Sequence, residues 1–295
     1  MNDDDRGRGL VSDVDRRRVG VRWSLRLTQG TLLLATLLAG LGPILWTAKG
    51  ALSPTQDLLR EPLRLWPSSV QWQNLSAAWS ELQIGRYLLN TVVLVGGSWA
   101  VQLLVAATGA FALSVLRPRY GRVVYGAILA TLFVPGTVSL VALYLTVLDL
   151  PITGGSIADT PWAVWLPAGA HAFNVLIMKQ FFDALPRELY QAAQVDGAGP
   201  VRLFWQIVMP MSRPILAVVS LLAVMDAWKD FLWPMVAISD TEAQPLAVAL
   251  PRLAETAEQN QVIAGMLVAI IPPLLLFLVF QRHIVRGIGF TGLKG

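Results

Sequence analysis

Three ionisable residues stand inside an otherwise apolar stretch of membrane-spanning length: Asp226, Lys229 and Asp230. A charged side chain at the centre of a membrane helix costs about 2.5–3.5 kcal/mol on insertion scales, so such residues usually face protein or water. Spacings of three and four residues place all three on one helical face, where two carboxylates compete for Lys229. Carboxylates accept hydrogen bonds from the hydroxyl groups of polar solutes such as sugars. The cluster is therefore a candidate contact site for a polar solute.

Two aromatic neighbours, Trp228 and Phe231, are candidates for stacking on such a solute. At 1.5 Å per residue, the cluster lies roughly 18–24 Å from the start of its segment at Pro214, in the outer half of a membrane. Two other roles remain open for it: a structural ion pair that packs the span against another subunit, and proton coupling. His171, in a second apolar helix, is either a proton relay or a histidine hydrogen-bonded between helices.

Signals for an enzyme or a resident cofactor are weak. The sequence has no Gly-x-Ser-x-Gly, His-Glu-x-x-His or phosphate-loop motif. It has no cysteine, and its two histidines, His171 and His283, do not suffice for a multi-histidine metal site. We therefore expect neither catalytic residues nor a bound metal. The pI of about 9.7 does not indicate nucleic-acid binding, because the basic residues flank apolar runs.

The composition indicates a membrane protein, because 55% of the 295 residues are hydrophobic and only 14% are charged. A spanning helix needs roughly 20 apolar residues. The sequence predicts an all-α integral membrane protein with six transmembrane helices. The predicted spans cover residues 25–48, 87–116, 123–148, 160–182, 214–238 and 259–281.

The distribution of basic residues predicts that both termini are cytoplasmic. Of the 23 Lys and Arg residues, 17 lie in the two terminal segments, the 117–122 loop and the 179–213 segment. Residues 1–24 are expected to form a disordered tail, and the first span is long enough to be retained rather than cleaved as a signal peptide. The external loops are expected to contain short interfacial helices over 49–86 and a short helix at Arg252–Glu258.

A polar segment over residues 186–213 separates the fourth and fifth predicted spans. Pro186 can open a helix, and Leu189, Ala192 and Ala193 share a face that presents little side chain to a partner. The pair Asp196-Gly197 predicts the end of this helix. A second helix is expected from Gly199-Pro200, with an apolar stripe of Phe204, Ile207, Val208 and Met211 and with breaks at Pro210 and Pro214. Such an elbow either lies on the lipid surface or contacts another protein.

This segment resembles the cytoplasmic EAA loop of ABC-importer permeases, in which a coupling helix sits in a cleft of the ATP-binding subunit. The family pattern falls on Gln191-Ala192-Ala193, Gly197 and Ile207–Pro210. Gln191 replaces the glutamate of the family, so the hydrogen-bonding reach is kept but the charge is not. The resemblance implies that the coupling residues are Glu188, Gln191, Ala192, Ala193, Asp196, Gly197, Ala198, Phe204, Ile207 and Pro210.

Further motifs extend the resemblance over residues 25–295, which are expected to form one ABC-importer transmembrane domain. They resemble the maltose-permease-G-like (MalG-like) carbohydrate branch. The matching residues are Asn90-Thr91, Val134-Pro135-Gly136, Trp228-Lys229-Asp230, Trp233-Pro234, and the tail from Gln281-Arg282 through Arg286-Gly287 to Lys294-Gly295. The resemblance adds Asn90 to the substrate-path candidates Asp226, Trp228, Lys229, Asp230 and Phe231.

The function implied by the resemblance is ATP-driven import of a sugar across the cytoplasmic (inner) membrane of a bacterium or archaeon. The implied partners are a second, MalF-like permease, two copies of a MalK-like ATPase that bind the ATP and Mg²⁺, an extracytoplasmic solute-binding protein and the lipid bilayer, with no nucleic acid. Other interpretations are an anionic substrate such as a glycerol phosphate, an ion-coupled secondary transporter and, more remotely, a membrane enzyme.

Overall fold

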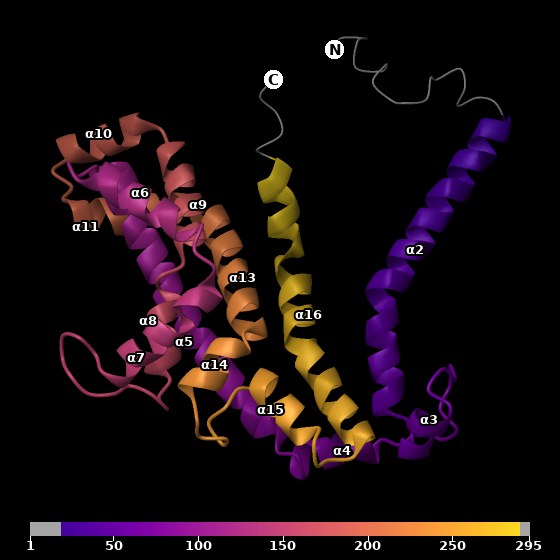
Figure 1. The fold of residues 1–295 in the computed structure, drawn as a ribbon. Helices are drawn as coiled ribbons and strands as arrows, with labels where there is room; N and C mark the ends of the chain where they lie inside the picture. Colours follow the sequence, from indigo (N-terminus) through magenta and orange to yellow (C-terminus); the bar gives the residue numbers. More distant parts are fainter. Residues whose placement is uncertain (1–18, 290–295) are drawn as a thin grey trace.

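The computed structural model describes residues 19–289, and every regular element in this range is a helix (Figure 1). The prediction of an all-α chain is confirmed for these residues. The long helices are α2 (Val19–Ala51), α5 (Ile84–Phe111), α13 (Arg213–Lys229) and α16 (Gln259–Gly289). The shorter helices are α3 (Thr55–Arg60), α4 (Gln73–Ser80), α6 (Gly121–Thr131), α7 (Leu140–Leu148), α8 (Trp162–Ala168), α9 (Ala172–Asp183), α10 (Arg187–Val195), α11 (Pro200–Leu203), α12 (Met209–Met211), α14 (Leu232–Ala237) and α15 (Leu246–Leu253).

Three helical stretches in the described range are long and apolar enough to cross a membrane. They are α2, α5 continued by the π-helical η2 (Ala112–Leu116), and α16 over Gln259–Gln281. Two bent pairs reach this length only when each is counted as one span. The first joins α6 to η3 (Gly136–Ser139) and α7 at 99°, and the second joins α11–α12 to α13 at 82°. The structure thus offers three to five candidate spans, where the sequence predicts six.

The difference arises from breaks inside the predicted spans. The 123–148 segment is interrupted before Pro135, which lacks an amide hydrogen and disfavours a helical conformation in the preceding residue. The 160–182 segment consists of α8 and α9, with His171 in an extended conformation between them. The 214–238 segment contains α13 and α14, because the backbone is extended at Asp230.

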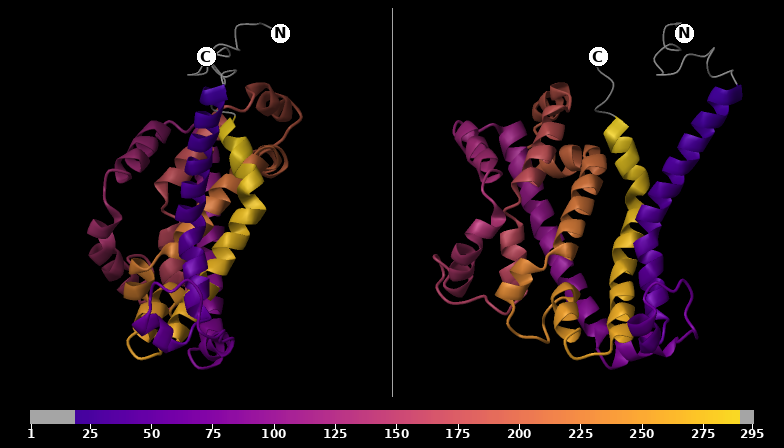
Figure 2. Two further views of the ribbon diagram at one scale, coloured as in Figure 1. Left: turned by 90° about the vertical axis from the view of Figure 1, so that its right-hand side faces the viewer. Right: turned by 45° about the vertical axis from the view of Figure 1, so that its right-hand side comes forward.

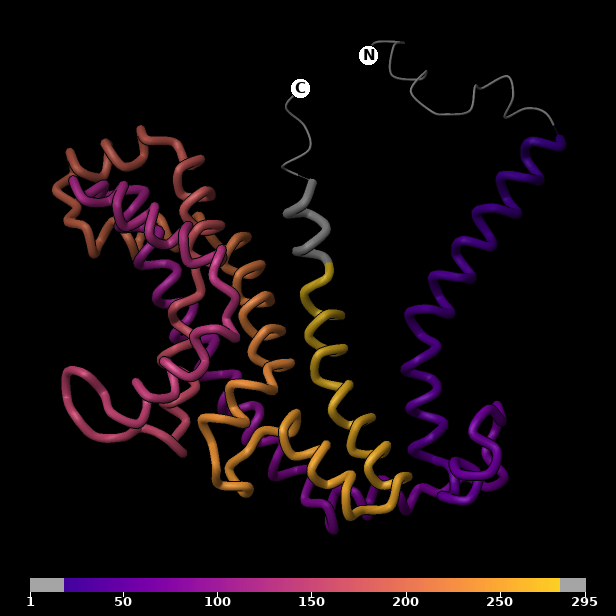
Figure 3. The backbone as a smooth tube through the Cα atoms, in the orientation of Figure 1, coloured from indigo at the N-terminus to yellow at the C-terminus, as the bar shows by residue number. Residues whose placement is uncertain are grey.

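The helices are arranged between two ends of the molecule. Figure 1 shows α10 and α11 at the same end as the start of α2 and the end of α16, and we call this the elbow end. The opposite end carries α3, α4 and α15, and we call it the loop end. At the centre, α5 packs against α8, α9 and α13. Helix α2 contacts α16 near the loop end and diverges from the bundle toward the elbow end (Figures 2 and 3).

Two apolar cores fix these ends. At the elbow end, small residues of α5, including Ala106 and Ala110, allow α9 to approach closely, and Phe111 meets Phe204 edge-on with ring centroids 5.1 Å apart. At the loop end, Ile84 packs against α15 and α16, where a Cβ atom on Gly265 would lie 2.9 Å from Ile84 Cδ1. The bundle is therefore tied together at both ends.

The predictions for the loops and the tail are partly wrong. Short helices in the 49–86 loop are confirmed as α3 and α4. The helix expected at Arg252–Glu258 is instead α15, which begins directly after Pro245 because its apolar side chains are buried against α5 and α16. The predicted tail of 1–24 overlaps α2, which is already helical from Val19. The rest of that tail and the Lys294-Gly295 motif lie outside the described residues.

Candidate functional site

The polar segment forms two helices at the elbow end, joined by the turn predicted at Asp196-Gly197. Gly197 has φ +75°, and its amide donates to Gln194 O at 3.0 Å. The Ala198 amide donates to Ala193 O at 2.9 Å. These two bonds form a Schellman motif, which closes the carbonyl end of α10 and places glycine where a left-handed backbone is needed. The predicted end of the first helix is confirmed.

The shared face expected for Leu189, Ala192 and Ala193 is divided in the structure. Ala193 is 7% exposed and belongs to the core at the elbow end, together with Leu203 and Phe204. Ala192 is exposed and Leu189 is 39% exposed. The small size of Ala193 thus serves packing within this chain, and only Ala192 and Leu189 are open to another protein. Among the other candidate coupling residues, Glu188, Gln191 and Asp196 are exposed.

The second helix of the elbow runs from α11 through the π-helical η4 (Phe204–Val208) into α12. Phe204 and Val208 are buried, Ile207 is half-buried and Met211 is exposed, so the predicted stripe is only partly internal. The break expected at Pro210 is absent. The helix continues to Met211 and turns at the buried Ser212. The elbow also exposes three further large apolar residues: Val195 at 88%, Val201 at 73% and Trp205 at 58%.

A cavity of about 350 Å³ lies between α5, η3, α7, α8, α13, α14 and the link from α8 to α9. It contains Asp226 and Asp230 of the predicted cluster, and it is otherwise largely apolar. Its polar lining comes from Thr91, Ser98, Gln102, His171, Asp226, Asp230 and Trp233. Within the described chain, the buried Ser98 Oγ and His171 Nδ1 have no hydrogen-bond partner. The site thus has polar groups from four elements around one space.

The cluster is not arranged as a single helical face. Lys229 Nζ lies 3.1 Å from Asp226 Oδ1, and His171 Nε2 lies 3.6 Å from Asp226 Oδ2. Asp230 follows the end of α13, and its carboxylate accepts a hydrogen bond from the Trp233 amide at 3.4 Å. The Lys229 side chain is 73% exposed and does not line the cavity. The competition expected for Lys229 is therefore resolved in favour of Asp226.

The aromatic candidates lie elsewhere. Trp228 lines a separate apolar groove with residues of α5 and α16, including Gly96 and Pro272. Phe231 is half-buried and lines neither that groove nor the cavity. The aromatic residue at the cavity is Trp233, whose indole Nε1 donates to Ala163 O at 3.0 Å.

Three polar residues of α5 line the cavity but are not among the predicted substrate-path residues: Thr91, Ser98 and Gln102. All three are buried in a helix that is otherwise apolar. Their spacings of seven and four residues place them on one face, and this periodicity is the signal that would have found them.

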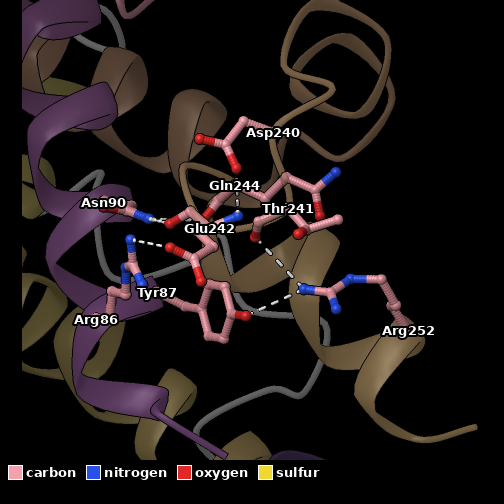
Figure 4. A network of polar contacts seen from close by, with 8 residues as sticks. All are labelled: Arg86, Tyr87, Asn90, Asp240, Thr241, Glu242, Gln244 and Arg252. Atoms are coloured by element: carbon pink, nitrogen blue, oxygen red, sulfur yellow. Dashed lines mark hydrogen bonds and ion pairs between the residues drawn. The ribbon is translucent and has the colours of Figure 1, made fainter. Parts of the chain in front are cut away.

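Asn90 lies outside the cavity, in a network that holds the 239–246 loop against α5 (Figure 4). Its side-chain amide donates to Glu242 O at 2.8 Å and to Gln244 O at 3.1 Å. One turn earlier, Arg86 forms an ion pair with Glu242 at 2.7 Å. Thr91 accepts a hydrogen bond from the Leu246 amide at 2.8 Å. Asn90 and Thr91 thus form hydrogen bonds with backbone groups of residues 242–246 and hold this segment against α5.

A family model described as "Binding-protein-dependent transport system inner membrane component" matches residues 102–289, which include the elbow and most of the cavity. The chain belongs to this family. It is a permease component of an ABC importer, an inner-membrane protein and not an enzyme. Transport in this family depends on a binding protein, and an ABC importer also needs an ATPase and a partner permease.

Relatives with assigned functions cover most of the chain. The diacetylchitobiose uptake system permease protein NgcG of Streptomyces coelicolor is 28% identical over 93% of this chain and 88% of its own. The sn-glycerol-3-phosphate transport system permease protein UgpE of Yersinia pestis is 28% identical over 93% of this chain and 97% of its own length. The melibiose/raffinose/stachyose import permease protein MelC of Bacillus subtilis is 26% identical over 78% of this chain and 84% of its own length.

The fold has a close counterpart among solved structures. A chain in the crystal structure of a bacterial ABC transporter that imports the acidic polysaccharide alginate superposes with a TM-score of 0.76. The two chains are 22% identical, and the match covers 93% of this chain and 99% of the other. The chain therefore has the type I ABC importer permease fold.

Proposed function

We propose that this chain is the transmembrane permease subunit of an ATP-driven importer for a sugar, either an oligosaccharide or a related carbohydrate. Two of the relatives, NgcG and MelC, carry names that specify sugar uptake. UgpE is named for glycerol 3-phosphate, which makes a phosphorylated substrate the second candidate. The charges at the cavity favour the first.

The observation that carries the proposal is that, among the residues the structure describes, two carboxylates and no lysine or arginine line the cavity. Asp226 and Asp230 can accept hydrogen bonds from hydroxyl groups, and Trp233 offers an apolar surface to a sugar ring. A phosphate entering the same space would meet like charge at short range. The ammonium group of Lys229, next to the cavity on α13, is paired with Asp226. The cavity thus suits an uncharged, hydroxyl-rich solute.

The proposed topology has six crossings, with the elbow end in the cytoplasm and one transmembrane domain over residues 25–295. The fourth crossing is formed by α8 and α9, and the third by the bent pair of α6 and α7. Support comes from the basic residues of the described chain, because more of them belong to elements of the elbow end, such as Arg117, Arg119 and Arg122, than to elements of the loop end. The partners in this scheme are a MalF-like permease, two MalK-like ATPases that hold ATP and Mg²⁺, and an external solute-binding protein.

The proposed mechanism is alternating access. Closure of the ATPases moves the elbow, which turns α9 and α13 and opens the cavity outward, and hydrolysis reverses the motion. Burial of Ala193, Phe204 and Val208 in the core of α5 and α9 supports this role, because it makes the elbow and the spans one packed unit. The exposed surface of Leu189, Ala192, Val195 and Val201 is the proposed contact with the ATPase.

Uptake by the reconstituted importer tests the substrate assignment. Vesicles with the cognate binding protein outside and ATP inside should accumulate a neutral oligosaccharide but not glycerol 3-phosphate. Asp230→Asn should reduce sugar uptake about tenfold or more, as expected for loss of a charged hydrogen-bond acceptor. The exposed Asp149→Asn is the matched control and should leave uptake unchanged. Accumulation of glycerol 3-phosphate would overturn the sugar assignment, and uptake without ATP would overturn the ATP-driven mechanism.

A charge placed on the elbow tests coupling. Val195→Glu with Val201→Glu should abolish binding-protein-stimulated ATP hydrolysis and uptake, because the contact surface becomes polar. Membrane insertion should remain normal, since both side chains are exposed in this chain. Leu63→Glu with Leu65→Glu, which are equally exposed at the loop end, provide the control. Normal coupling in the elbow variant would show that this surface does not contact the ATPase.

A further inference from the structure

A second cavity, of about 670 Å³, lies at the elbow end and has no part in the scheme above. It is lined by η2, the 117–120 turn, the first turns of α6, the last turns of α9 and the start of α10. Figure 1 shows these elements together at the outer edge of the bundle. Five basic side chains and one acidic side chain line it: Arg117, Arg119, Arg122, Lys179, Arg187 and Asp183.

Asp183 neutralises only part of this charge. It accepts hydrogen bonds from Lys179 Nζ at 2.6 Å and from Ser114 Oγ at 2.7 Å, and Arg117 Nη2 lies 3.7 Å away. Its bonding capacity is thus taken up by neighbours. The other three cations of the cavity form no ion pair with any carboxylate in the described part of the chain: Arg119, Arg122 and Arg187.

The elements beside the cavity indicate which anion would enter it. No residue of α6 is buried, and Val123 and Val124 of its first turn are exposed. Deeper in the same helix, Tyr125 lines the cavity, with Lys179 Nζ 4.8 Å from its ring centroid. A basic pocket therefore lies at the end of an apolar, outward-facing helix. This arrangement fits a molecule with an anionic head and a long apolar tail.

We propose that this cavity binds the phosphate headgroup of an anionic membrane lipid, whose acyl chains lie along the exposed face of α6. Guanidinium groups bind phosphate oxygens in pairs, and basic pockets between membrane helices on the cytoplasmic side recognise such headgroups. Arg187 is the first residue of α10, so the bound lipid would contact the start of the elbow. The lipid would thus hold the elbow at a fixed position relative to α6 and α9.

Lipid retention by the purified, assembled importer tests the proposal. The complex is titrated with phosphatidylglycerol or with phosphatidylcholine, and bound lipid is counted by native mass spectrometry. We expect phosphatidylglycerol to bind at least about tenfold more tightly, and the double variant Arg119→Gln/Arg122→Gln to lose that preference. Arg119→Lys/Arg122→Lys should retain most of it. Arg60→Gln/Arg64→Gln, at the loop end, is the charge-matched control and should behave as wild type.

Three results would overturn the proposal. Equal binding of both lipids would show that the pocket does not select an anionic headgroup. Complete displacement of phosphatidylglycerol by millimolar inorganic phosphate would identify a site for free anions. Loss of the ATPase subunits from the glutamine variant, with lipid retention unchanged, would identify the pocket as a protein interface. The lysine variant and the intact mass of the complex separate each of these results from simple misfolding.

Discussion

Ala192 and Ala193 are adjacent in sequence but face different surroundings. Successive residues of a helix point about 100° apart, so a family pattern of two small residues need not serve a single contact. Here Ala193 fills a position in the core of its own chain, and Ala192 faces outward. One alanine therefore keeps the elbow attached to the bundle, and the other is free to meet a partner.

A larger side chain separates the two roles. Ala193→Leu should lower stability by about 1–3 kcal/mol, because extra methylene groups must be forced into a packed core. Ala192→Leu should change stability by less than about 0.5 kcal/mol, since the site is exposed. Thermal unfolding in detergent measures both. If the Ala192 variant is the less stable of the two, the assignment of the faces is wrong.

Asp183 should make stability at the elbow end depend on pH. Burial opposes ionisation of this carboxyl, but the hydrogen bonds from Lys179 and Ser114 outweigh it and hold the pKa below the ordinary value of 3.8. A group with a lowered folded-state pKa contributes stability above its unfolded pKa, and this stability is lost as pH falls through the folded value. The contribution should be no more than about 1 kcal/mol, because 36% of the side chain is exposed.

The measurement compares Asp183→Asn with wild type by thermal unfolding at several pH values. The wild type should be the more stable protein at pH 7, and the difference should shrink as the pH is lowered through and beyond 3.8. The control is Asp196→Asn, an exposed carboxylate at the end of α10. A difference that grows at acid pH would mean that the pKa is raised rather than lowered.

At the scale of elements, contact between α5 and α8 depends on one glycine. A Cβ atom on Gly97 would lie 2.1 Å from Trp165 Cε2, whereas one on Gly96 would meet nothing within 4 Å. Trp165 is held in place because its indole Nε1 donates to Leu94 O at 3.1 Å. The two helices can pass this closely only where a side chain is missing.

Gly97→Ala should therefore destabilise the protein by about 1–3 kcal/mol, since the indole must leave its hydrogen bond or the helices must separate. Gly96→Ala should be neutral or slightly stabilising, because alanine favours the helix and its methyl group has open space. Intrinsic tryptophan fluorescence during thermal unfolding reports both variants. Equal melting temperatures would show that α8 does not rest on α5 as described.

The elements also show what the sequence can and cannot predict. The turn at Gly197 follows from local backbone chemistry and was predicted from residue types. The break before Pro135 also has a local cause, but the predicted span over 123–148 ran through it. The position of α15 and the continuation of the elbow helix through Pro210 depend on which side chains are buried by distant elements. The side of α13 that carries Trp228 also depends on a neighbour, α16. Tertiary packing decides these points, and the local sequence pattern does not reveal which distant elements will pack together.

At the scale of the whole molecule, much apolar surface is left uncovered by this chain. The membrane-length window of α2 has no buried residue, and the helix leans away from the bundle (Figure 3). In a bilayer such surface faces lipid or a partner permease, and it explains why hydropathy finds this span so readily. The arrangement also places the elbow and the 49–86 loop at opposite ends, so the two segments should be exposed on opposite sides of the membrane.

The absence of cysteine makes this prediction of opposite sides simple to test, because a single introduced cysteine supplies the only thiol in this chain. Val195→Cys and Leu63→Cys replace residues that are 88% and 83% exposed at the elbow end and the loop end. In intact cells, a membrane-impermeant maleimide should label Leu63→Cys and not Val195→Cys. In inside-out vesicles the pattern should reverse, and the ATPase should protect Val195→Cys from labelling. Labelling of both thiols from one side would rule out the proposed topology, and labelling of Val195→Cys at full rate in the assembled importer would place the ATPase elsewhere.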